Sequence, residues 1–187
     1  MDHETARRGV LDAIPLLASK RSEKKVIAAL WEMGYDRAAA EQLTPPNATE
    51  GHGIAIKSKN TQPASDVPNV VVYEDYQCPI CQTYESHYGK TFDSLASSGR
   101  LRIEYRTRTF LDRNLKSLND SKGVPESSKR AAMAAACADQ VGKFQEYHDA
   151  AYAKAPEEEG DGYSVQKLRD EIAADAGITG DDLTTFQ

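Results

Sequence analysis

The chain has 187 residues, of which 40% are hydrophobic and 28% are charged, and its formal net charge is −6. This length and composition suit one globular domain with an appendage and some open stretches. The negative charge argues against nucleic acid or an anionic membrane surface as the main partner, and no apolar run approaches the ~18 residues that span a bilayer.

Residues 1–43 predict a helical N-terminal arm. Apolar residues recur there at helical spacing on either side of Gly34, and Pro45 and Pro46 end the pattern. Asp12 interrupts the short apolar centre of the first twenty residues, and no convincing cleavage site follows. We therefore predict neither a signal peptide nor a membrane anchor in this segment.

Residues 44–68 have the composition of a linker, with four prolines among Asn, Ser, Thr and Gly. Within this linker, residues 53–57 alternate between apolar and small or polar side chains, which indicates a short edge strand. The folded domain is expected to follow, over residues 69–187.

The domain begins with a predicted strand, helix and strand. The continuous run Val70–Val72 predicts a strand that is buried on both faces. Residues 80–95 carry apolar side chains at helical steps and predict a helix with one apolar face. Residues 101–110 alternate, with Leu101, Ile103 and Tyr105 on one face. Short connections in such a unit imply two parallel strands.

A helical insertion is expected over about residues 125–187. Residues 112–126 are polar and turn-rich, and Ser127 or Ser128 would cap the helix that follows. That helix would share an inward face that includes Met133 and Cys137, which makes Cys137 a buried, unreactive thiol by default. Further helices are predicted over 144–154, 164–176 and from Thr179 to the last residue.

Between the first strand and its helix lies the sequence Cys78-Pro79-Ile80-Cys81. A cysteine at a helix N-terminus faces unpaired N–H groups and the positive end of the helix dipole, which lower a thiol pKa from ~8.5 to about 3.5–7.5 in such motifs. Pro79 suits the first helical turn because it has no N–H to lose. Cys78 would attack a disulfide or receive oxidation, and Cys81 would resolve the mixed disulfide.

Two acidic residues, Glu74 and Asp75, precede this motif. If they lie close to the cysteines, their charge disfavours a thiolate. Alternatively, one of them relays a proton to or from Cys81. The residues alone leave both roles open.

A structural zinc site is a less favoured interpretation of the two cysteines. Zinc would need His87 or His148 to complete its ligands, and the sequence has no second CxxC and no HxxxH. We therefore predict no metal and no cofactor. We expect His87 to lie on a helix surface and His148 to be a hydrogen-bonded packing residue.

Three segments together resemble the DsbA-like thioredoxin-fold proteins of bacteria, and the actinobacterial exported or membrane-anchored type most closely. They are VYEDYQCPIC at 72–81, LRIEYR at 101–106 and KFQEYHDA at 143–150. The resemblance implies an α/β fold of the thioredoxin type with an inserted helical bundle. It also implies a thiol–disulfide oxidoreductase, with Cys78 as nucleophile and Cys81 as resolving partner. The expected partners are cysteine-containing exported proteins and a redox partner in the cell envelope.

The sequence departs from this family in two respects. The dipeptide between the cysteines is Pro-Ile, without the histidine of the strongly oxidising members. The family continues beyond a helix like 181–187 into a cis-proline loop, two strands and a final helix, so this chain resembles a C-terminally truncated member. A thioredoxin-like binding or chaperone module without catalysis is therefore an alternative function. Because the chain resembles a truncated member, Cys137 is also a candidate for a structural disulfide with a cysteine beyond Gln187.

Overall fold

The structure, a computed structural model, describes residues 44–56 and 66–187. The predicted arm over residues 1–43 lies outside the described residues. The chain divides into two compact units, Met1–Ala48 and Thr49–Gln187, and the second unit contains every element discussed below. Within the described residues, no helix is long and apolar enough to cross a membrane.

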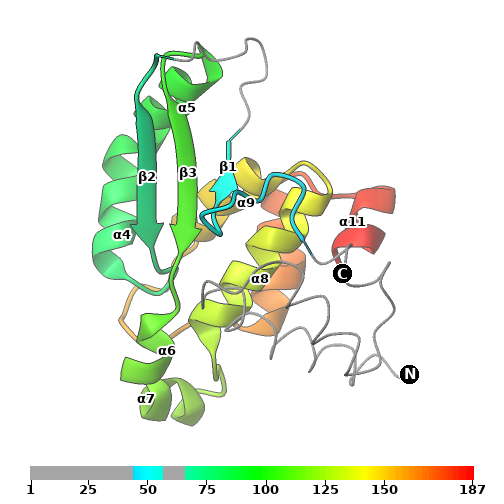
Figure 1. The fold of residues 1–187 in the computed structure, drawn as a ribbon. Helices are drawn as coiled ribbons and strands as arrows, with labels where there is room; N and C mark the ends of the chain where they lie inside the picture. Colours follow the sequence, from blue (N-terminus) through cyan, green and yellow to red (C-terminus); the bar gives the residue numbers. More distant parts are fainter. Residues whose placement is uncertain (1–43, 57–65) are drawn as a thin grey trace, which may run out of the picture. The chain divides into compact units, whose positions relative to one another are not determined.

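A three-stranded sheet forms the centre of this unit (Figure 1). Strand β1 (Ile54–Ala55) lies in the segment where alternation predicted a short strand, and it runs antiparallel to β3 (Arg102–Thr107). Strand β2 (Asn69–Glu74) pairs with β3 in parallel, with Val70 opposite Ile103. The predicted parallel unit is thus confirmed. The carboxyl ends of β2 and β3 meet at the same end of the sheet.

The burial of β2 differs from the prediction. The strand was expected to be covered on both faces, but Val70–Val72 are half-buried and Tyr73 is 53% exposed. In the strand order β1-β3-β2, β2 lies at an edge of the described sheet. A neighbouring strand therefore shields only one of its two edges, and the valine side chains are partly accessible from the other edge. Its partner β3 is central, and Ile103 and Tyr105 are buried as predicted.

The helix after the cysteines contains a π-helical turn. It runs as α4 (Pro79–Tyr84), η1 (Glu85–Gly89) and α5 (Lys90–Ser97) without a break in helical backbone angles. The predicted single apolar face is wrong in its first half, where Ile80 is 80% and Tyr88 is 55% exposed. A π turn contains more residues than an α turn. The residues before it are therefore rotated about the helix axis relative to the residues after it, and the two sets do not share one face.

Two short helices, α6 (Phe110–Asn114) and α7 (Lys116–Ser121), occupy a region predicted to be irregular. The N–H group of Leu111, in the first turn of α6, donates to the Asp75 carboxylate at 3.1 Å. A distant side chain therefore stabilises this helix start, and the local sequence does not contain that signal.

The predicted insertion is helical. It comprises α8 (Ser127–Gln140), α9 (Phe144–Ala153), η2 (Lys167–Ile172), α10 (Ala173–Asp175) and α11 (Gly180–Phe186). The predicted serine cap of α8 is wrong, because Ser127 and Ser128 lie inside the helix. The carboxylate of Asp112 instead accepts the N–H groups of Ser128 and Lys129, at 2.8 and 2.9 Å.

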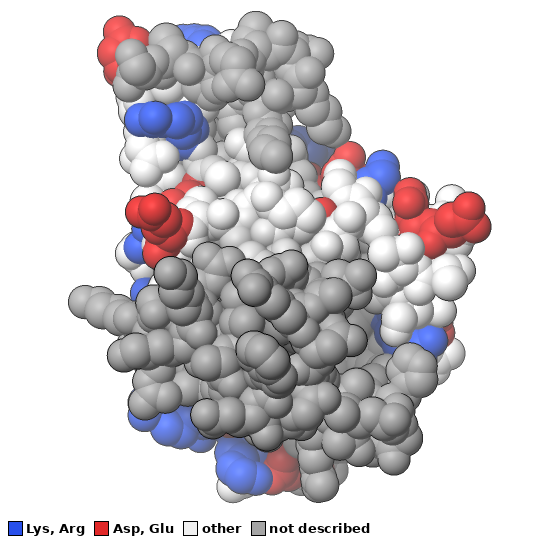
Figure 2. Space-filling view, turned by 45° about the vertical axis from the view of Figure 1, so that its right-hand side comes forward, with Lys and Arg blue, Asp and Glu red and all other residues white. Residues whose placement is uncertain are grey.

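The inward face of α8 also differs from the prediction. Ala131, Ala135 and Ala138 are buried, whereas Cys137 is exposed, so the expected buried thiol is wrong. The small alanines let the neighbouring helices approach, and the volume of the core comes from aromatic side chains on other elements: Tyr76, Tyr105, Phe144, Tyr147, Tyr152, Tyr163 and Phe186. On the face shown in Figure 2, the acidic and basic side chains of the described residues are interspersed around the surface.

Candidate redox site

The two cysteines lie where β2 leads into α4. The N–H of Cys78 donates to the Asp75 carbonyl at 2.8 Å, which closes a tight turn after the strand. Cys78 is the N-cap of α4, with extended backbone angles of φ −83° and ψ 116°, and Pro79 occupies the first helical turn. Both thiols are free and half-buried, and the Cys81 thiol is hydrogen-bonded to Cys78. One helical turn is therefore enough to bring the two sulfur atoms together.

The surroundings of Cys81 keep its thiol protonated. Burial raises its pKa to about 12, and the hydrogen bond to Cys78 and the charge of Glu74 act in the same direction. The sulfur of Cys81 is thus a protonated thiol at neutral pH. Any reaction in which this sulfur acts as a nucleophile needs a proton acceptor nearby.

Glu74 forms a buried ion pair with His148 behind the cysteines. The Nε2 atom of His148 lies 3.0 Å from both carboxylate oxygens of Glu74, and both side chains are about 1% exposed. Burial opposes the charged imidazole, but Glu74 and Asp149 outweigh it and raise the pKa of His148 to about 10. The aromatic rings of four residues surround the imidazole: Tyr76, Tyr105, Phe144 and Tyr152. His148 is a hydrogen-bonded packing residue, as predicted.

Asp75 has a different environment from its neighbour. Its carboxylate accepts hydrogen bonds from the N–H groups of Gln77 and Leu111 and from the hydroxyl of Ser128, at 3.0, 3.1 and 2.6 Å. Burial raises the pKa of Asp75, although these three bonds oppose the shift. Its bonds connect the turn to α6 and α8, which gives Asp75 a positioning role in the fold.

The side chain of Gln77 also stabilises the turn before the cysteines. Its side-chain amide donates to Asp112 at 3.1 Å and to Ser128 at 2.7 Å, and its oxygen accepts from Asn119 at 2.9 Å. Sequence reasoning missed this residue, since a polar side chain before a cysteine gives no local signal of such a network. The buried amide fixes the residue that directly precedes Cys78.

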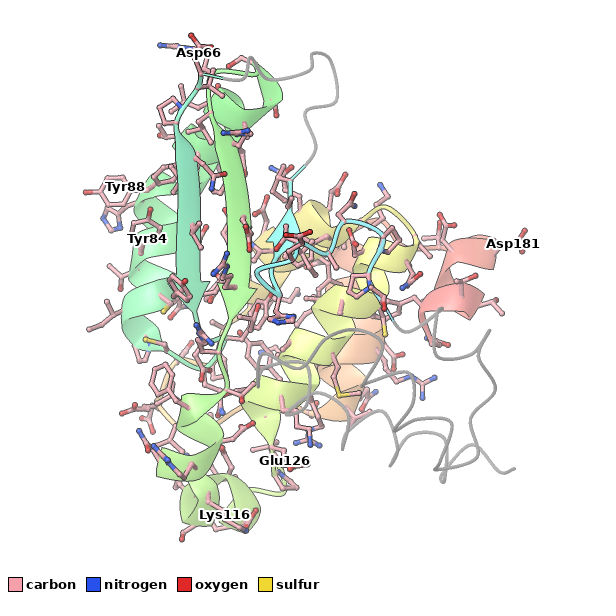
Figure 3. The ribbon with its side chains drawn as sticks, in the orientation of Figure 1. Asp66, Tyr84, Tyr88, Lys116, Glu126 and Asp181 are labelled. Carbon is pink, nitrogen blue, oxygen red and sulfur yellow. The ribbon has the colours of Figure 1, made fainter. Side chains whose placement is uncertain are left out.

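An apolar groove of about 330 Å³ runs along the outer edge of β2. Its lining consists of Val70–Glu74 from the strand and Ile80, Cys81, Tyr84 and Glu85 from the helix. Figure 3 shows Tyr84 and Tyr88 on the helix beside β2. Cys81 thus borders an open apolar surface.

Glu85 is a second functional candidate that sequence reasoning missed. Burial raises its pKa to about 7, and the charges of Glu74, Asp149 and Asp93 add to the effect while His148 opposes it. The sequence could have indicated Glu85 by its position four residues after Cys81, which places the two side chains on the same side of a helix.

The described residues do not support the alternative of zinc bound by the cysteines. Within the described ranges, the cluster of possible donors within 4.8 Å contains Glu74, Glu85 and His148, and neither cysteine belongs to it. These three groups form a charge cluster in which His148 is the cation. His87 is exposed, as predicted, and its Nδ1 atom lies 2.8 Å from the Thr83 carbonyl on its own helix.

The family model described as thioredoxin matches residues 62–186, well over half of the chain. The chain belongs to the thioredoxin family. No curated protein compared with the chain matches it. The predicted resemblance to DsbA-like members of this family is confirmed by the similarity to solved structures.

Those solved structures come from actinobacteria. Oxidised DsbA from Mycobacterium tuberculosis is 24% identical with a TM-score of 0.56, over 72% of this chain and 68% of that protein. The disulfide bond oxidoreductase DsbG of the same organism is 24% identical with a TM-score of 0.56, over 74% and 67%. MdbA from Corynebacterium diphtheriae, a thiol-disulfide oxidoreductase, is 18% identical with a TM-score of 0.55, over 72% and 64%. The chain thus spans about two thirds of each relative, and these likenesses establish its DsbA-like fold.

Proposed function

We propose that the chain is a thiol–disulfide oxidoreductase in which Cys78 exchanges with a substrate disulfide and Cys81 resolves the product. The observation that carries this proposal is the hydrogen-bonded pair of free thiols at the start of α4, with Cys78 as the N-cap. The unpaired N–H groups of a first helical turn favour a negative sulfur at that position. The DsbA-like fold supports the same chemistry.

Glu74 is the proposed proton acceptor for Cys81. It is buried, it lines the same groove as Cys81, and its charge contributes to raising the pKa of the Cys81 thiol. Asp75 is a weaker candidate, because Glu74 lines the groove with Cys81 and its charge acts on the Cys81 thiol, whereas Asp75 does not line that groove. A buried carboxylate that receives the proton allows Cys81 to react as a thiolate at neutral pH.

A trapping experiment tests the exchange. The exposed Cys137 is first replaced by Ser, so that only the two site cysteines can react. In that background, Cys81→Ala is expected to accumulate a mixed disulfide with a model disulfide peptide, because the resolving thiol is missing, whereas Cys78→Ala should accumulate none. Intact-protein mass spectrometry measures both. Equal trapping in the two variants, or none in either, contradicts the proposal.

The proposed substrates are cysteine-containing proteins exported to the cell envelope, with a separate redox partner that restores the cysteine pair. The resemblance of residues 72–81, 101–106 and 143–150 to exported DsbA-like proteins supports this location. Labelling of Cys78 in intact cells with a membrane-impermeant thiol reagent is the test. Labelling that occurs only after cell lysis would contradict the location without affecting the exchange chemistry.

A second candidate function is a binding or chaperone module that needs no catalysis. The apolar groove along β2 and the exposed side chain of Ile80 favour it, since such a surface binds apolar segments of other proteins. This function predicts that binding of an unfolded client protein survives the joint replacement Cys78→Ala and Cys81→Ala. Binding that is lost in this variant would exclude a cysteine-independent role.

A further inference from the structure

We propose that Glu85 exchanges protons between the buried Glu74 and solvent in the groove, and that Gly89 keeps open the space that the Glu85 carboxylate occupies. The inference rests on the proposed function, because it supplies the outer end of the proton path that begins at Cys81. Glu85 acts through Glu74 and is therefore a positioning residue and not a catalytic one.

Glu74 has almost no direct access to solvent. Glu74 is 2% exposed, so a proton that it receives from Cys81 needs a second group to leave the protein. A carboxylate oxygen of Glu85 lies within 4.8 Å of the Glu74 carboxylate and of a ring nitrogen of His148. Glu85 also lines the groove with Cys81. It is thus close to the buried pair and to the surface at once.

Gly89 leaves space for the Glu85 carboxylate. A Cβ atom added at Gly89 would lie 2.7 Å from the Oε2 atom of Glu85, which is closer than real contacts allow. The backbone angles of Gly89, φ −50° and ψ −55°, are ordinary for a helix, so conformational freedom does not require glycine there. The missing side chain makes room for the carboxylate, and the π turn η1 brings both residues to this place.

Several charged groups surround Glu85. The titratable groups that face it are Glu74 on β2, Tyr84 on α4, Tyr105 on β3, Asp93 on α5, and His148 and Asp149 on α9. Burial together with three acidic neighbours gives Glu85 a pKa of about 7. A group that is half-protonated at neutral pH can both accept and release a proton there.

The resolving step conserves protons and electrons. Cys81 gives its proton to Glu74, its sulfur attacks the Cys78 sulfur of the mixed disulfide, and the Cys78–Cys81 bond forms. The bond from Cys78 to the substrate breaks, and the substrate sulfur leaves with the electron pair and takes a proton from solvent. Before the attack, Glu74 passes the proton from Cys81 to Glu85, which keeps Cys81 deprotonated, and Glu85 releases the proton to water in the groove.

The test resolves the two steps of exchange. Reduced protein carrying Cys137→Ser reacts with oxidised glutathione between pH 5 and 9, and acid quenching with mass spectrometry gives the rate of mixed-disulfide formation and the rate of its resolution. In the parent protein the resolving rate should rise through an inflection near pH 7. Glu85→Gln should remove the inflection and slow resolution about 10- to 100-fold at pH 8, with formation unchanged; a direct acid–base group typically contributes 10²–10⁴-fold.

Gly89→Ala is the second variant, because it keeps the charge and moves the carboxylate. Alanine also favours a helix more than glycine does, so a loss of rate cannot be attributed to a weakened helix. It should remove the inflection as Glu85→Gln does. Glu157→Gln, a matched change in an exposed loop, should leave the profile unchanged.

The outcomes separate the two proposals. If the parent protein forms no mixed disulfide on Cys78, the proposed function fails. If it forms and resolves one with the same profile in Glu85→Gln and Gly89→Ala, only the role of Glu85 is wrong. An inflection that Asp93→Asn removes and Glu85→Gln keeps would assign the path to Asp93 instead. If Glu85→Gln alone removes it, the role of Gly89 is wrong.

Discussion

Replacing Glu85 by Gln should stabilise the protein at neutral and alkaline pH. The carboxylate is partly buried among the acidic residues Glu74, Asp93 and Asp149, so its charged form is unfavourable in the folded state. Glutamine has nearly the same shape as the protonated acid and carries no charge. The substitution therefore removes an electrostatic penalty of the folded state while retaining most of the packing.

The magnitude follows from proton linkage. The pKa of Glu85 is raised from its ordinary value of 4.5 to about 7. The favourable contribution of the protonated form is fully present below pH 4.5 and is lost as the pH rises through 7. At about 1.4 kcal/mol per pKa unit, complete burial would give about 3 kcal/mol. Because Glu85 is partly exposed and solvent screens it, we expect about 1–2 kcal/mol.

Urea unfolding at pH 4 and pH 8 provides the assay. Glu85→Gln and the parent protein should have nearly equal free energies of unfolding at pH 4, whereas Glu85→Gln should be more stable by about 1–2 kcal/mol at pH 8. Glu157→Gln serves as the control for the change in net charge. A variant that is less stable at pH 8, or a difference that is the same at both pH values, would refute this account of Glu85.

Two further predictions concern His148 and Asp75. His148→Leu leaves the buried Glu74 without its cation and should cost about 3–5 kcal/mol in urea unfolding at pH 6, and adding Glu74→Gln should recover most of it. Since the pKa of His148 is raised from 6.5 to about 10, the stabilisation is present below pH 6.5 and is lost as the pH rises through 10, so the deficit should shrink there; a constant deficit would be contrary evidence. Asp75→Asn turns an amide toward the Leu111 N–H and should cost about 1–3 kcal/mol, while leaving the rate of glutathione exchange at Cys78 nearly unchanged. A large fall in that rate would instead favour a proton relay through Asp75.

The parts of the fold that the sequence predicted depend on neighbours along the chain. The alternation that buries Ile103 and Tyr105 is a property of one strand. The placement of Cys78 at the helix start follows from a strand, a turn and Pro79 in succession. Each of these features can be predicted from a short stretch of sequence, because the interacting groups are only a few residues apart.

The parts that were missed depend on groups that are distant in sequence. Helix α6 begins where Asp75 accepts an N–H group from 36 residues away, and α8 is capped by Asp112 from 16 residues away. The burial of β2 depends on which strands lie beside it, and the exposure of Cys137 depends on which face of α8 meets its neighbours. No local pattern encodes these choices, since either face of an alanine-rich helix is apolar.

Two substitutions test the role of Glu85 independently. Glu85→Gln removes the charge, and Gly89→Ala should push the carboxylate away from its present place, which should lower its pKa from about 7. Both variants should therefore be more stable than the parent protein at pH 8, and both should resolve mixed disulfides more slowly. Ordinary damage to the fold lowers stability and rate together. A gain in stability that accompanies a loss of rate is instead expected of a group whose burial is unfavourable for folding and useful for proton transfer.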